Sequence, residues 1–107
     1  MGFDISATLQ SMESAVKTTV TGAWPQAQQI WASFEQTNKN ILADMAQATI
    51  TGQMSKADLQ SYLDDMKTTL QTQLLASEVM ALAVAQAAAN AALDVFWAAV
   101  NAAIPTI

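Results

Sequence analysis

The chain has 107 residues, of which 52% are hydrophobic and 12% are charged, and its formal net charge is −5. A chain of this length forms at most one domain, so we predict a single all-helical domain over residues 1–107. The charged fraction is about half that of an average soluble domain, which predicts apolar surface in need of a partner.

The composition excludes several classes of function. Cysteine and histidine are absent, which removes disulfides, thiolate chemistry, the commonest general base and the commonest transition-metal ligand. There is no arginine, and the four lysines stand against nine carboxylates, so no basic patch is available for a nucleic-acid backbone. We therefore predict a protein that is not an enzyme, takes no cofactor or metal, and does not bind nucleic acid.

The N-terminus lacks the basic residues and the apolar run of a signal peptide. We expect synthesis in the cytoplasm without classical secretion, and the sequence leaves the final compartment open.

Glycine and proline divide the chain into helical segments. The first segment, residues 5–21, carries apolar residues every three or four positions, the spacing of one face of a helix. The second segment covers residues 25–50. Pro25 suits its first helical position and Gly52 suits the position just past its end.

A third helix is predicted to begin after Ser55, where Ser55 and Asp58 form a variant of the capping box. Nothing then interrupts the helical pattern until Pro105. We predict one continuous helix over residues 56–104, about 72 Å long at 1.5 Å per residue.

The second half of this predicted helix is rich in alanine, and its one charged residue is Asp94. A helix that is apolar on nearly all sides is buried on several of them. We expect other subunits or lipid to cover it, through an interface made of Ala81, Ala85, Ala88, Ala92, Phe96, Trp97 and Ala99. Polar residues at spacings near four form a seam that we predict sets the register between helices: Glu78, Gln86, Asn90, Asp94 and Asn101.

Two layouts place these segments. Residues 5–50 and 56–104 have similar lengths, which predicts a long antiparallel helical hairpin, coiled-coil-like, with a kinked N-terminal arm and its tip at residues 51–55. The alternative is a three-helix bundle, in which the chain turns sharply at residues 22–25 and the far half of the last helix projects without cover.

We predict a non-enzymatic structural protein that self-assembles into a homo-oligomer, such as a ring, filament or shell, through its alanine-rich C-terminal helix. The alternative is a membrane- or lipid-surface-active helical protein, either an oligomeric pore or a lipid or granule coat. A central aspartate costs roughly 2.5–3.5 kcal/mol on membrane insertion, and alanine offsets little of that. This cost favours another copy of the chain over lipid as the partner of the alanine-rich helix.

Overall fold

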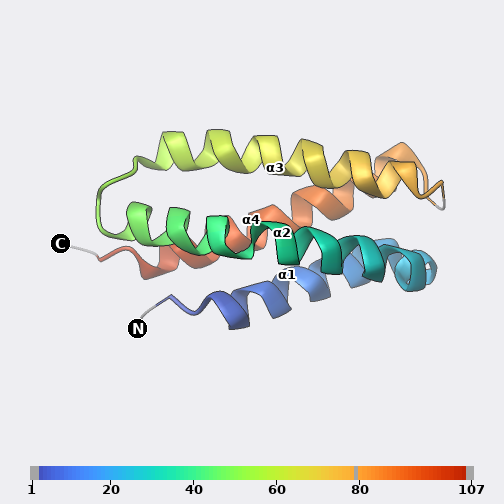
Figure 1. Ribbon diagram of the computed structural model, residues 1–107, viewed down its shortest axis with the longest axis horizontal. Helices are drawn as coiled ribbons and strands as arrows, with labels where there is room; N and C mark the ends of the chain where they lie inside the picture. Colours follow the sequence, from blue (N-terminus) through green and yellow to red (C-terminus); the bar gives the residue numbers. More distant parts are fainter. Residues whose placement is uncertain (1–2, 79, 106–107) are drawn as a thin grey trace.

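Four α-helices and one 3-10 turn make up the described residues, 3–78 and 80–105, of the computed structural model (Figure 1). The elements are α1 (Ile5–Val20), η1 (Thr21–Ala23), α2 (Trp24–Ile50), α3 (Lys56–Ala76) and α4 (Leu82–Ala103). The predicted all-α class is confirmed, because the described residues contain helices and no strand.

Short-range capping interactions define the helix ends that the sequence predicted. The Asp4 carboxylate accepts a hydrogen bond from the Ala7 N–H at 3.2 Å and caps α1. Ser55 Oγ accepts one from the Asp58 N–H at 3.0 Å and caps α3. Gly52 lies just past the end of α2 with φ 82°, a backbone conformation that glycine adopts without steric cost.

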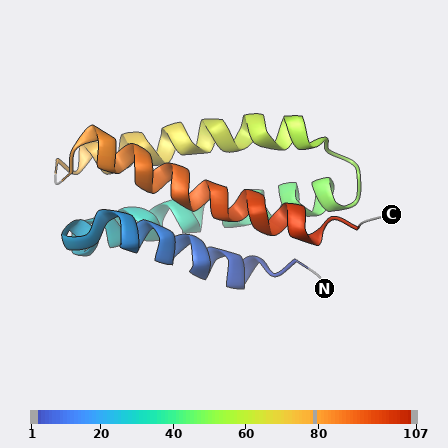
Figure 2. The same cartoon turned by 180° about the vertical axis from the view of Figure 1, so that it is seen from behind.

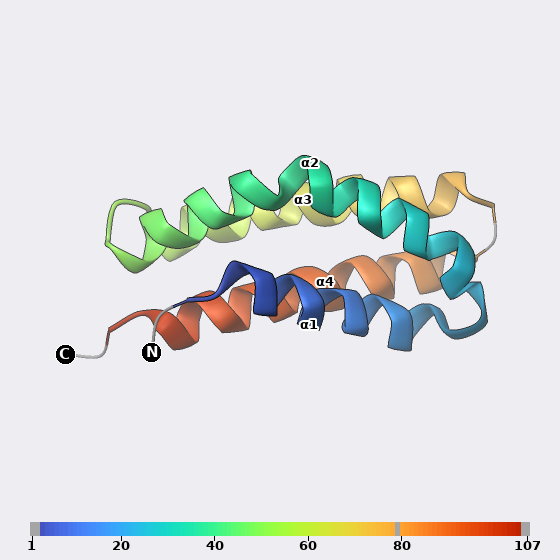
Figure 3. The same ribbon diagram turned by 60° about the horizontal axis from the view of Figure 1, so that its bottom comes forward.

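The chain reverses direction at η1, so α1 folds back along α2 (Figure 3). This is the sharp turn of the alternative layout, and residues 5–50 do not form one kinked arm. Pro25 lies in the first turn of α2, where its missing N–H leaves no hydrogen bond unmade. The similar lengths of residues 5–50 and 56–104 therefore do not reflect two paired arms.

The predicted continuous helix over residues 56–104 is wrong. α3 ends at Ala76, and α4 begins at Leu82 and runs back along both α3 and α1. Glu78 lies between them with φ 61°, in the left-handed region that costs a residue with a Cβ about 1–2 kcal/mol. Burying a side chain such as Leu93 or Phe96 contributes about 1.5–3 kcal/mol, so reversing the chain is favoured over an extended rod.

The helices form two layers, with α2 and α3 in one and α1 and α4 in the other (Figure 3). The bundle measures 45 × 23 × 21 Å. Two of its three reversals, at η1 and between α3 and α4, lie at one end, while the α2–α3 connection, the start of α1 and the end of α4 lie at the other (Figure 2).

The alanine-rich helix α4 is covered by the chain itself. Its inner face, which we define by seven residues that are 0% exposed, packs against the rest of the bundle. These residues are Ala85, Ala88, Ala89, Ala92, Leu93, Phe96 and Val100. The expectation that this helix needs other subunits or lipid as its cover is therefore wrong for its inner face. The sequence pattern does not show that α4 lies between α1 and α3. Two neighbouring helices therefore cover α4, whereas the hairpin layout gave it one.

We predict that Phe96→Ala lowers the free energy of unfolding by about 3–5 kcal/mol, because it leaves a cavity in the core. Phe96 is fully buried, and its ring meets that of Phe3 edge to face at a centroid distance of 5.8 Å. Urea denaturation followed by circular dichroism measures the change. The control Tyr62→Ala, at a side chain that is 52% exposed, is expected to change it by about 0.5 kcal/mol or less. Equal losses from both variants would contradict the packing of α4 described above.

Candidate assembly surface

Charged side chains are unevenly distributed between the two layers. In the α1 and α4 layer, the charged helical residues are Glu13, Lys17 and Asp94. The α2 and α3 layer carries Glu35, Lys39, Asp44, Lys56, Asp58, Asp64, Asp65 and Lys67. The second layer is therefore a solvated polar surface, whereas the first has few charges to keep it in water.

The side of α4 that faces away from the core is made mainly of alanine. We call one stripe of this side, Ala83, Ala87, Ala91, Asp94, Ala98 and Ala102, the outer face of α4; the other exposed residues of the helix are Leu82 and Gln86. Ala91 is half-buried and the other five are exposed. Small side chains let the backbones of two helices approach closely, so this surface has a shape suited to packing on another helix.

The residues predicted to form the interface fall in three environments. Ala85, Ala88, Ala92 and Phe96 belong to the inner face of α4 and contact the chain's own core. Trp97 and Ala99 are half-buried beside neighbouring helices, and Ala81 is exposed just before α4 begins. The four core residues are not accessible to a second subunit in the closed bundle, and their part in an interface between copies stays a prediction.

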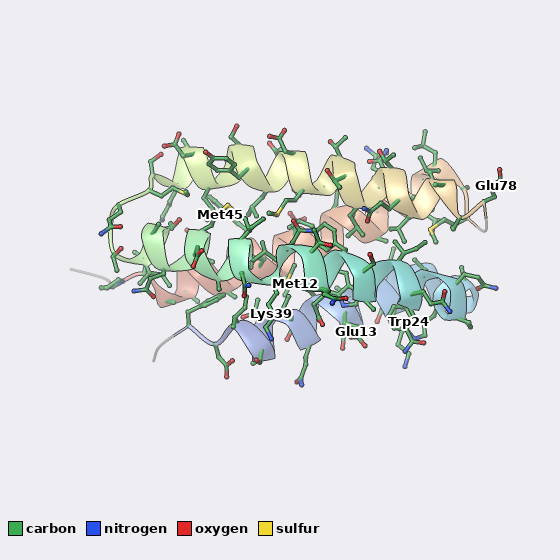
Figure 4. The ribbon with its side chains drawn as sticks, viewed as in Figure 1. Met12, Glu13, Trp24, Lys39, Met45 and Glu78 are labelled. Atoms are coloured by element: carbon green, nitrogen blue, oxygen red, sulfur yellow. The ribbon has the colours of Figure 1, made fainter. Side chains whose placement is uncertain are left out.

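Of the predicted polar seam, Gln86, Asn90, Asp94 and Asn101 lie along one side of α4, and Glu78 lies outside it. Glu78 is exposed and lies outside the helices, at the end of the bundle (Figure 4). Gln86 is exposed on α4, and Asn90 is half-buried. Asn101 donates from Nδ2 to the Trp97 carbonyl oxygen at 2.8 Å, a bond within its own helix.

Asp94 is the seam residue that joins two helices. Lys67 Nζ of α3 lies 3.0 Å from Asp94 Oδ1 and 3.9 Å from Asp64 Oδ1. The side chain of Asp94 is 65% exposed and that of Lys67 is 25% exposed, so water screens the pair. The pair neutralises the one charge of the outer face of α4 and orients α4 on α3.

The aromatic side chains are divided between the core and its edge. Trp31 and Phe34 are 1% exposed and lie 5.5 Å apart between ring centroids, whereas Trp24 and Trp97 are half-buried. The buried Nε1 of Trp31 has no hydrogen-bond partner among the described residues. Trp31 is therefore a residue of the packed core.

The described residues contain no group of three or more acidic side chains placed to hold a metal ion. One surface depression lies where α1 begins and α4 ends, and Phe3, Ala7, Ala99 and Ala102 line it. Its walls are mainly apolar, and its polar groups are the Asp4 carboxylate, which caps α1, and the Thr8 hydroxyl, which donates to the Asp4 carbonyl oxygen at 2.8 Å. Comparisons with protein families, with curated proteins and with solved structures found no match.

Sequence reasoning missed the alanines that face outward. Ala83, Ala87 and Ala98 recur at helical spacing on the side opposite the inner face. This pattern is visible when the sequence is plotted on a helical wheel. In that projection the polar residues Gln86, Asn90, Asp94 and Asn101 mark the side of α4 that lies opposite the core.

We predict that a double-mutant cycle of Lys67→Gln and Asp94→Asn gives a coupling of about 0.2–1 kcal/mol, the range of partly exposed ion pairs. Added salt is expected to reduce it. Urea denaturation of the four proteins measures the coupling. The matched cycle of Lys67→Gln with Asp65→Asn is expected to give none, since Asp65 forms no ion pair with Lys67 in the described structure. Equal couplings in the two cycles would show that the contact does not orient α4.

Proposed function

We propose that this chain is a non-enzymatic structural protein that self-assembles through the outer face of α4 and the adjoining side of α1. The observation that carries the proposal is the composition of that face. Among its six residues the one charge, Asp94, already has Lys67 as its partner. On the outer face of α4, packing two copies would therefore desolvate an ion pair and not a lone carboxylate.

The shape of the outer face of α4 also supports the proposed self-assembly. Ala83, Ala87 and Ala98 have side chains of one carbon atom and project little from the helix. Ala7 of α1 lines the same surface depression as Ala102 of α4, so this low surface continues onto α1. Helices with such surfaces pack at short distances, which increases their dispersion contacts.

We predict that Ala98→Glu raises the dissociation constant of the assembly by about tenfold or more, because it places a new carboxylate in the contact on each copy. Sedimentation velocity in buffer without detergent measures this. Ala32→Glu makes the same change at an exposed position of α2 and is expected to leave the assembly intact. A monomeric wild-type protein at all concentrations would contradict the proposal, as would equal effects of the two variants.

The second candidate is a lipid-active protein, and a specific observation favours it. α4, Leu82–Ala103, is long and apolar enough to cross a membrane, although 39% of its apolar window is buried inside the bundle. The bundle would have to open before α4 entered lipid. The exposed large apolar side chains Ile41, Tyr62 and Leu82 of the described residues belong to three different helices, so the closed bundle has no helix face of bulky apolar residues to insert.

We predict that the folded protein stays below the vesicles in flotation with uncharged phosphatidylcholine liposomes, because alanine gains little from lipid. The distribution of the protein across the gradient is the measurement. An amphipathic helical peptide of known lipid affinity is the positive control. Co-flotation of the protein would favour the lipid-active candidate over self-assembly.

A further inference from the structure

The connection between α3 and α4 differs from the other two reversals of the chain. The α1–α2 reversal contains Gly22 and is followed by Pro25, and the α2–α3 connection contains Gly52 at φ 82°. The α3–α4 connection, Ser77-Glu78-Val79-Met80-Ala81, contains neither glycine nor proline. Glu78 adopts φ 61° there, with a Cβ that disfavours this backbone.

The start of α4 is weakly capped, whereas Ser77 caps the end of α3 by donating from Oγ to the Leu74 carbonyl oxygen. Ala81 precedes α4 without a side-chain cap, and the first turn of α4 has no acidic residue. The last turn of α3 has no basic residue. Local sequence thus favours a continuous helix through this connection, and the reversal depends on burial of the inner face of α4.

The inner face of α4 is complementary in shape to one surface, which α1 and α3 form together. α4 is the last helix and packs on α1 and α3, so it can separate from them without any part of the chain being threaded through another. Separation of α4 would expose the side chains of Leu93 and Phe96 to water, and both are 0% exposed in the bundle. Exposing this apolar surface is unfavourable, so it needs a new cover. A second copy that has also released α4 presents the same surface of α1 and α3.

We infer that two copies of this chain exchange α4, with residues 56–103 of each becoming one helix and each α4 packing on α1 and α3 of the other copy. The inference rests on the proposed self-assembly and adds the way in which the copies join. The exchanged contact uses the inner face of α4, whereas the proposed assembly surface is the outer face. Glu78 is the hinge, since exchange removes its left-handed backbone.

The Lys67–Asp94 pair reports exchange directly. Lys67 belongs to α3 and Asp94 to α4, at 3.0 Å, so the pair lies within one chain in the closed bundle and between two chains after exchange. The Lys67–Asp64 pair, at 3.9 Å within α3, stays within one chain in both states and is an internal control. A water-soluble carbodiimide joins either pair as an amide, with loss of water from the ammonium and carboxyl groups to the reagent.

The experiment mixes unlabelled and ¹⁵N-labelled full-length protein in urea, refolds them together and separates monomer from dimer before coupling. In the dimer fraction we expect half of the Lys67–Asp94 linked peptides to join one light and one heavy segment, as random exchange requires. The Lys67–Asp64 peptides are expected to be uniformly light or heavy. A dimer whose Lys67–Asp94 peptides are all of one label overturns exchange and leaves the outer-face assembly intact. Absence of any dimer overturns both.

Variants of the hinge make a second, independent test. Glu78→Gly removes the Cβ penalty in the closed state and weakens the helix in the exchanged state, so the dissociation constant should rise about tenfold for each hinge and about 100-fold for two. Glu78→Ala should lower it about fourfold, because alanine favours the continuous helix.

The matched control for these variants is Thr21→Gly, which makes the same change at the other residue with a Cβ and positive φ, 48°. It lies in the α1–α2 reversal, which exchange leaves unaltered, so it is expected to stabilise both states equally. An unchanged dissociation constant in Glu78→Gly, or an equal rise in Thr21→Gly, overturns the assignment of Glu78 as the hinge.

Discussion

Burial of the inner face of α4 is the constraint on which the rest of the structure depends. Its seven residues are 0% exposed, and they pack within the core between α1 and α3. Leu93, Phe96 and Val100 each contribute about 1.5–3 kcal/mol through burial, against about 1–2 kcal/mol for the left-handed backbone of Glu78. The balance favours reversal of the chain after α3, and this reversal turns three predicted segments into four packed helices.

The same helix explains why a self-contained bundle still has a surface suited to association. α4 is apolar on both sides, so burying its inner face leaves alanines such as Ala87 and Ala98 in contact with water. The α2 and α3 layer carries most of the charged residues and keeps its own side solvated. This asymmetry between the layers leaves the α1 and α4 layer as the side of the bundle with few charges.

The two surfaces of α4 imply two ways for copies to meet. The outer face is available in the closed bundle, and Lys67 keeps its one charge paired there. The inner face becomes available only when the α3–α4 connection opens. It can then pack on α1 and α3 of a second copy that has also opened. The first route preserves the monomer fold, whereas the second exchanges an element of it.

Several helix ends could be read from the sequence, because a cap depends on residues within one turn. Asp4, Gly52 and Ser55 lie where their residue types predict. The break after Ala76 could not be read, since no residue of that connection disfavours helix as glycine or proline would. Which alanines face inward was marked only by the polar residues of α4, Gln86, Asn90, Asp94 and Asn101, since apolar side chains occupy its other sides. The packing of α4 between α1 and α3 decided the break and the burial of those alanines, as burial is a property of neighbours distant in the chain.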